Sequence, residues 1–191
     1  MVNQILIRPG LPADLDDVFA IHTQARNAYY AAGGLVAAQI DTPVEANGRR
    51  AGWARAIARA EGRVLCAVVS DVVVGVAAMC SIHADPRTGS RSRRDGDPDA
   101  VIGELRQIHV RPDHWNGGIG SALHAGFVQF LRDTSASFGL LEAWERNERG
   151  HAFYTRHGWR PDGHRRPGPG GASYLCMRLA PPGRERAGQP G

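Results

Sequence analysis

The sequence predicts a mixed α/β fold in which helices flank one central twisted sheet. Three observations predict it. Strand-like and helix-like segments follow one another in the order β-α-α-β-β-β-α-β-α-β, the composition is 42% hydrophobic and 22% charged, and the 191 residues suffice to bury a core without disulfides. We therefore expect a single domain over residues 1–180, followed by a flexible tail over 181–191.

The N-terminal third contains one predicted strand and two predicted helices. The strand covers 5–8, and a helix that begins near Pro12 is ended by Gly33 and Gly34. Residues at helical spacing give this helix one inward face: Leu15, Val18, Phe19, His22, Ala25 and Tyr29. A second helix is expected over about 46–60, with Trp53 inward and Gly62 as its end.

The middle of the chain predicts three strands and a long loop. The β-branched runs at 64–69 and 72–79 indicate a hairpin, and residues 84–100 form a polar loop that is either solvated or a lid facing the substrate. In the next strand, 101–110, the apolar Leu105 has the opposite parity to Ile108 and Val110. A β-bulge near Arg106 and Gln107 would reconcile them and would bend this fourth strand away from the fifth.

The C-terminal third predicts two helices and two strands. A helix over 118–133 is followed by a strand over 140–144, a helix over 148–157 and a last strand over 173–179. A turn-rich stretch of prolines and glycines precedes that last strand.

Charge and composition restrict the function classes. The net charge is +4, and all 23 basic residues are arginine, which either reflects codon usage or favours an anionic ligand. No run of about 18 apolar residues predicts a membrane span, and the N-terminus lacks the features of a secretory signal. We therefore expect a cytoplasmic protein with three reduced thiols: Cys66, Cys80 and Cys176.

Two further ligand classes are disfavoured. The arginines of 84–100 lack the interleaved aromatic residues expected of a nucleic-acid binder. The histidines do not form a compact ligand pattern, so we expect no metal site: His109, His114, His124, His151, His157 and His164.

The most informative segment is a glycine-rich turn between a strand and a helix, over 110–123. Glycines let backbone amides approach a ligand, and the N-terminus of a helix favours an anion such as a diphosphate. The chain has no lysine, which excludes a P-loop, and Leu123 breaks the Rossmann pattern that Gly118 and Gly120 begin. Glycines serving only a tight turn remain the alternative.

This turn, V-x-P-x-x-x-x-x-G-I-G-S-x-L, strongly resembles the acyl-CoA pyrophosphate loop of the GNAT superfamily of N-acyltransferases. The segment 144–159 resembles the superfamily's N-x-x-A-x-x-F-Y-x-x-x-G-[FW] motif, and the opening Ile-Arg-Pro at 7–9 is typical of it. The resemblance covers about residues 4–180. Trp115 stands where Gln or Arg is usual, and Asn116 where glycine is usual; asparagine tolerates the left-handed region that such a turn requires.

The resemblance implies the GNAT fold, with its sheet splayed at the bulge, and acetyl-CoA bound in the gap between the fourth and fifth strands. It implies direct acetyl transfer, in a ternary complex, to a primary amine of a small molecule, peptide or protein. The residues expected to bind the cofactor are Ile108, His109, Val110, Trp115, Asn116, Gly117, Gly118, Ile119, Gly120, Ser121, Asn147 and Tyr154. Asn147 is also interpreted as a plain helix N-cap. Because dimers are common in this superfamily, the resemblance is also compatible with a homodimer.

The resemblance also implies roles in catalysis. Glu104 is the candidate general base, directly or through water, with His109 as its rival, and Tyr154 is the candidate general acid. Tyr29, Tyr30 and Trp53 either line the acceptor pocket or pack in the core. The alternative function is an acyl-CoA-binding regulatory module that has lost catalysis.

Overall fold

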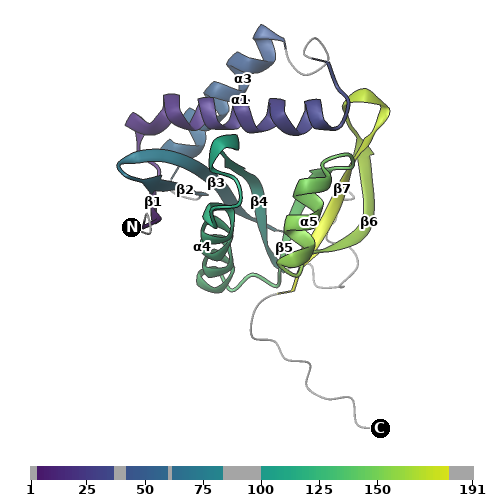
Figure 1. Ribbon diagram of the computed structural model, residues 1–191. Coiled ribbons are helices and arrows are strands. Elements are labelled where there is room, and N and C mark those ends of the chain that lie inside the picture. The colour runs from purple at the N-terminus through teal and green to yellow at the C-terminus, as the bar shows by residue number, and fades with distance from the viewer. Residues whose placement is uncertain (1–3, 37–41, 60–61, 84–99, 181–191) are drawn as a thin grey trace.

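The computed structural model describes residues 4–36, 42–59, 62–83 and 100–180, and over them it confirms a mixed α/β fold (Figure 1). Among these described residues the sheet has seven strands in the order β1-β2-β3-β4-β5-β7-β6, and only the β4–β5 pair is parallel. The strands are β1 (Leu6–Pro9), β2 (Gly62–Val69), β3 (Val72–His83), β4 (Val101–Val110), β5 (Phe138–Trp144), β6 (Arg160–Pro167) and β7 (Ser173–Leu179). The helices are α1 (Leu15–Ala32), α3 (Pro43–Ala58), α4 (Ile119–Asp133) and α5 (Glu148–Arg156).

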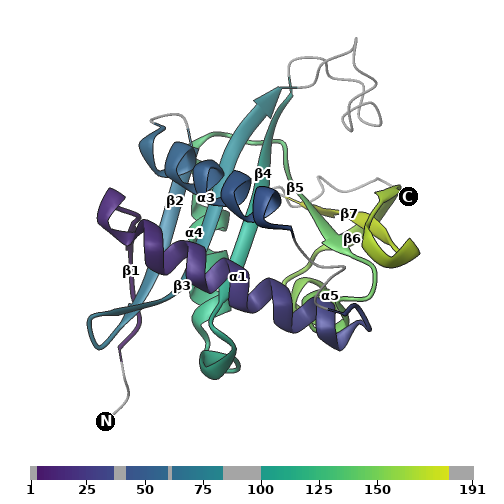
Figure 2. The ribbon, with the colours of Figure 1, turned by 90° about the horizontal axis from the view of Figure 1, so that it is seen from above.

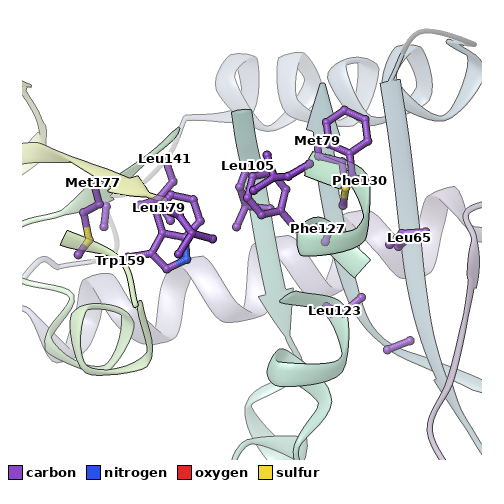
Figure 3. Close-up of a cluster of buried hydrophobic side chains, with 14 of the residues drawn as sticks. Leu65, Met79, Leu105, Leu123, Phe127, Phe130, Leu141, Trp159, Met177 and Leu179 are labelled. Carbon is purple, nitrogen blue, oxygen red and sulfur yellow. The ribbon is translucent and has the colours of Figure 1, made fainter. Parts of the chain in front are cut away.

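Helices cover both faces of the sheet. α1 and α3 lie on one face and α4 lies on the other, as the two ribbon views agree (Figures 1 and 2). Val18, Trp53 and Val76 belong to the smaller core between α1, α3 and the sheet. The larger core surrounds α4 and extends from Leu65 of β2 to Met177 of β7, so it spans both halves of the sheet (Figure 3).

Two helix boundaries follow from local capping. α1 ends at Gly33, as expected. α3 begins earlier than expected, at Pro43, because the Thr42 hydroxyl accepts the Glu45 N–H and the Glu45 carboxylate accepts the Thr42 N–H. Gly62 does not end this helix, as we expected, but is the first residue of β2.

The sequence analysis missed the strand β6. It pairs with β7 at the edge of the sheet, and its residues are almost all exposed. Two prolines and a glycine within Arg160–Pro167 indicate a turn. A solvated edge strand does not need alternating apolar residues, so no apolar pattern indicated a strand instead. The turn-rich interpretation holds for the next residues, where Gly170 and Gly171 have φ of 66° and 71°.

The expected β-bulge is present at Arg106. Gln107 pairs with Ala78 and Leu105 with Met79 of β3, so Arg106 is the extra residue. Leu105 and Ile108 consequently both reach the α4 core, although their parity differs. Beyond Glu104 no further β4–β5 pairs form: the two strands are paired only over residues 102–104 and then diverge (Figure 2). The splay expected between the fourth and fifth strands is therefore confirmed.

Some expectations fall outside the described residues, namely the loop at 84–99 and the tail over 181–191. Ala100, the last residue of the expected loop, is buried. None of the described helices is long and apolar enough to cross a membrane.

Candidate active site

A cleft of about 1100 Å³ lies where β4 and β5 separate. Its walls come from α1, α3, β4, the N-terminus of α4, β5, α5 and the β6–β7 edge. The cleft therefore extends from the glycine turn, through the gap in the sheet, to the face that α1 covers.

Most of the sequence-predicted site residues line this one cleft. They are Glu104, Ile108, His109, Val110, Trp115, Asn116, Gly118, Ile119, Gly120, Ser121, Asn147, Tyr154, Tyr29 and Tyr30. Two are not part of its lining. Gly117 lies in the turn beside it, and Trp53 is buried in the core, where its indole N–H donates to Nδ1 of His22 at 2.8 Å.

The glycine turn leaves the N-terminus of α4 accessible from the cleft. Gly118 is the N-cap, with φ of 82°, and as a glycine it has no side chain to cap the first N–H groups of the helix. Those N–H groups lack partners within the helix and carry the positive end of its dipole. Asn116 has φ of 66°, so it does adopt the left-handed conformation. The turn can hold an anion such as a diphosphate on its backbone amides.

Side chains tie this turn to β4 and α5. The Trp115 indole N–H donates to the Val110 carbonyl at 2.9 Å. Arg149 of α5 donates to the Asn116 side-chain oxygen at 3.0 Å, and its guanidinium lies 4.3 Å from the centre of the Trp115 ring. The tryptophan at the position usual for Gln or Arg thus fixes the turn against the end of β4.

The backbone of β4 offers a donor to the gap. The Arg111 N–H donates to Val74 of β3 at 2.9 Å. Because consecutive N–H groups of a strand point to opposite edges, the Val110 N–H points away from β3, toward the gap beside β5.

Tyr154 lies across the cleft on α5 and is only partly exposed. Burial raises the pKa of its phenol well above the usual 10, so the hydroxyl remains protonated at neutral pH and can donate a hydrogen bond. Asn147 caps α5 by accepting the Gly150 N–H at 2.9 Å, and it also lines the cleft.

Glu104 stands at the point where β4 leaves β5. Its side chain is 19% exposed, and its carboxylate lies 3.0 Å from the Arg106 guanidinium. The Cys80 thiol lies 3.8 Å from the same carboxylate oxygen. The bulge residue Arg106 thus places an ion pair at the mouth of the gap.

His109 is buried on the opposite face of β4 from Leu105 and stacks on His22 of α1, with the ring centres 4.2 Å apart. Its Nε2 lies 2.7 Å from Oε1 of Gln107. Burial, helped by the charges of His22 and Arg26, holds the pKa of His109 well below 6.5. The ring is therefore neutral at neutral pH.

The sequence analysis missed several lining residues. Two of them, His22 and Arg26, precede the predicted Tyr30 on α1 at intervals of four and face the cleft with it, so their helical periodicity was an available signal. Trp144 and Tyr174 form an aromatic wall with Tyr30, whose hydroxyl is hydrogen-bonded to that of Tyr174. No local sequence pattern predicts this wall, since its members come from three separate elements.

The lining of the cleft offers donors that can bind an organic anion. Within the four described ranges, no group of three or more histidine, cysteine, aspartate or glutamate residues is arranged to hold a metal ion. Backbone amides around Gly118–Ser121 are available to bind an anion, and several arginines are also among the lining residues.

Solved structures share this fold. PaiA N-acetyltransferase from Thermoplasma acidophilum, in complex with coenzyme A, is 16% identical, with a TM-score of 0.73 over 93% of this chain and 99% of that one. Arabidopsis thaliana NAA60, in complex with a bisubstrate analogue, is 15% identical, with a TM-score of 0.70 and the same coverage. Ribosomal-protein-alanine N-acetyltransferase from Brucella melitensis is 23% identical, with a TM-score of 0.63 over 92% and 99%.

The sequence itself matches a family. No curated protein matches the chain. The profile of the acetyltransferase (GNAT) family matches residues 20–159, which include the glycine turn, the splayed strands and α5. This match covers most of the sequence, and the chain therefore belongs to the GNAT acetyltransferase family.

Proposed function

We propose that the protein is an N-acetyltransferase that transfers the acetyl group of acetyl-CoA to a primary amine of a small molecule, peptide or protein. One observation carries the proposal. A single cleft joins an amide-lined anion site at α4, an inward N–H at Val110, the Glu104 carboxylate and the protonated phenol of Tyr154. Acetyl-CoA supplies a diphosphate and an activated acetyl group to such a site.

In the proposed reaction, both substrates are bound together. Glu104, directly or through water, accepts a proton from the acceptor ammonium, and the freed nitrogen lone pair attacks the thioester carbonyl carbon. The Val110 N–H donates to the carbonyl oxygen as its negative charge grows. The C–N bond forms and the C–S bond breaks, Tyr154 donates its proton to the departing sulfur, and the nitrogen releases its second proton to solvent.

His109 is the rival base. Because the pKa of His109 is low, its ring is neutral at neutral pH and can accept a proton, but the same low pKa makes the ring a weak base. A carboxylate at the mouth of the gap reaches solvent more directly, so we place the base at Glu104.

The test measures CoA thiol release from acetyl-CoA with a panel of primary amines. We expect Tyr154→Phe to lower kcat while binding of acetyl-CoA is retained. We expect Glu104→Gln to lower kcat/KM by about 10²-fold or more and to change the shape of its pH profile. Asp133→Asn is the matched control, since Asp133 lies outside the cleft and pairs with Arg63.

One result would overturn the proposed function, and another would overturn the assignment of the base. If acetyl-CoA binds but no amine is acetylated, and Tyr154→Phe changes nothing, the protein is an acyl-CoA-binding regulatory module. If Glu104→Gln leaves both rate and pH profile unchanged, the base lies elsewhere, with His109→Gln as the next variant.

A further inference from the structure

His157 lies behind the anion site at α4, at the end of α5, and contacts that site through the side chain of Ser121. Its Nε2 lies 3.1 Å from the Ser121 hydroxyl oxygen. Ser121 belongs to the first turn of α4 and to the cleft lining, whereas His157 is not part of the described lining. Side chains of a helix lean toward its N-terminus, so the Ser121 hydroxyl lies beside the backbone amides of the anion site.

The other ring nitrogen of His157 determines which atoms carry the protons. Nδ1 lies 2.9 Å from the Phe153 carbonyl oxygen, which can only accept a hydrogen bond. Nδ1 therefore carries a proton, and in the neutral ring Nε2 accepts the Ser121 O–H. In the protonated ring, the Nε2–H donates to the Ser121 oxygen instead. The Ser121 O–H is then released from the ring and can donate into the cleft.

Close packing of α5 against the start of α4 holds this pair in place. A Cβ added at Gly120 would lie 3.2 Å from the Phe153 ring, so the two helices are in contact one residue before Ser121. The centre of the Phe153 ring also lies 4.3 Å from that of the His157 ring. His157 is partly exposed, so its ring can exchange a proton with solvent.

Two neighbouring groups affect the charge of His157. The His124 ring of α4 lies 4.6 Å away, centre to centre, and its Nε2 accepts the Trp159 indole N–H. Burial, and then the charge of His157, lowers the pKa of His124 to about 4, so His124 is neutral at neutral pH. Arg156 precedes His157 on α5 and lines the cleft. Its positive charge opposes a proton on His157, whereas an anion bound at α4 favours one.

We propose that His157 is a positioning residue for the diphosphate of acetyl-CoA, and that it takes up a proton from solvent when this diphosphate binds. The protonated ring donates to the Ser121 oxygen, and the Ser121 O–H donates to the diphosphate. Hydrogen bonds to charged groups are stronger than those between neutral groups, which favours this arrangement once the anion is present. The proposal rests on the proposed function, because it takes acetyl-CoA as the donor.

The test measures binding and proton uptake rather than acetyl transfer. Its ligand is 3′-dephospho-CoA, because the 3′-phosphate of CoA has an ionisation of its own near about pH 6 and the diphosphate does not. Calorimetry at pH 7 in buffers of different ionisation enthalpy gives the number of protons taken up per ligand bound. For the wild-type protein we expect net proton uptake, and about tenfold tighter binding at pH 6 than at pH 8.

Two variants assign the proton to the His157–Ser121 pair. His157→Gln supplies an amide that can donate to Ser121 without titrating, so it should lose most of the proton uptake and bind with nearly equal affinity at pH 6 and pH 8. Ser121→Ala removes the hydroxyl through which His157 acts and should lose the same proton uptake, and the double variant should lose no more.

His164→Gln is the matched control, because His164 is exposed on β6 and outside the described cleft lining. It should bind the ligand and take up protons as the wild type does. Thermal unfolding shows whether each variant is folded, and Ser121→Ala tests the proton uptake by itself if His157→Gln is not.

The outcomes are distinguishable. If His157→Gln takes up as many protons as the wild type, the proton binds elsewhere and the proposal is wrong. If Ser121→Ala retains the uptake that His157→Gln loses, His157 does not act through Ser121 and its positioning role is wrong. If 3′-dephospho-CoA binds with the expected proton uptake but no amine is acetylated, the proposed function fails while the role of His157 stands. If the folded wild-type protein does not bind the ligand, both proposals fail.

Discussion

Lowering the pH from 7.5 to 5 should destabilise the fold through two buried histidine–tryptophan pairs. Trp53 donates its indole N–H to His22 at 2.8 Å, and Trp159 donates to His124 at 2.9 Å. Both histidines are 5% exposed. A protonated imidazole has no lone pair to accept an indole N–H, so charging either ring breaks its hydrogen bond and places a charge in the core.

The magnitude follows from proton linkage. Burial is the main cause that lowers the pKa of His22 from 6.5 to about 3 and that of His124 to about 4. Because these pKa values are depressed in the folded state, the unfolded chain binds more protons below pH 6.5, and stability falls as the pH falls. At 1.4 kcal/mol per pH unit, the interval from 6.5 to 5 gives about 2 kcal/mol for each histidine.

The assay is urea denaturation at pH 7.5, 6 and 5, with the free energy of unfolding extrapolated to water. His22→Gln and His124→Gln keep an acceptor for the indole, and each should reduce the loss of stability between pH 7.5 and 5 by about 2 kcal/mol. His83→Gln is the control, since His83 is exposed at the end of β3. If all three variants lose as much stability on acidification as the wild type, the reasoning is wrong.

Three further predictions concern the glycine turn and the packing of α4 against the sheet. Gly118→Ala should lose about 1–2 kcal/mol by holding a Cβ at φ of 82° and should weaken CoA binding in calorimetry, whereas Gly48→Ala, in α3 with open space around it, should raise the melting temperature. Trp115→Phe removes the 2.9 Å hydrogen bond to Val110 and should raise the KM for acetyl-CoA several-fold with little change in stability; an unchanged KM would show that the indole N–H is dispensable. Gly103→Ala would overlap Leu131 and should destabilise by about 1–3 kcal/mol in denaturant titrations, a result that normal stability would contradict.

Local patterns predicted those parts of the fold whose causes are local. The bulge at Arg106 followed from the parity of Leu105 and Ile108, which a regular strand cannot satisfy on one face. The cleft-lining glycine turn followed from residues that are adjacent in the chain. The strand β6 did not, because an exposed edge strand is formed by pairing with β7 rather than by its own apolar residues.

Site residues that belong to sequence motifs could be predicted, whereas residues whose place depends on tertiary contacts could not. Trp53 had two interpretations from its sequence, pocket or core, and only its contact with His22, 31 residues away, places it in the core. Likewise, nothing near Tyr30 in the chain indicates that its hydroxyl meets Tyr174. Such pairs are decided by how α1 crosses the sheet, which no local periodicity encodes.

The gap between β4 and β5 has a mechanical consequence. Backbone pairing joins the two strands over only three positions, 102–104 with 138–140. Within the paired segment, Phe127 and Leu131 of α4 pack closely against Gly139 of β5. Since protein cores are stiff and transmit strain, we expect that one methyl group added where α4 packs against Gly139 would change the spacing of β4 and β5 along the cleft.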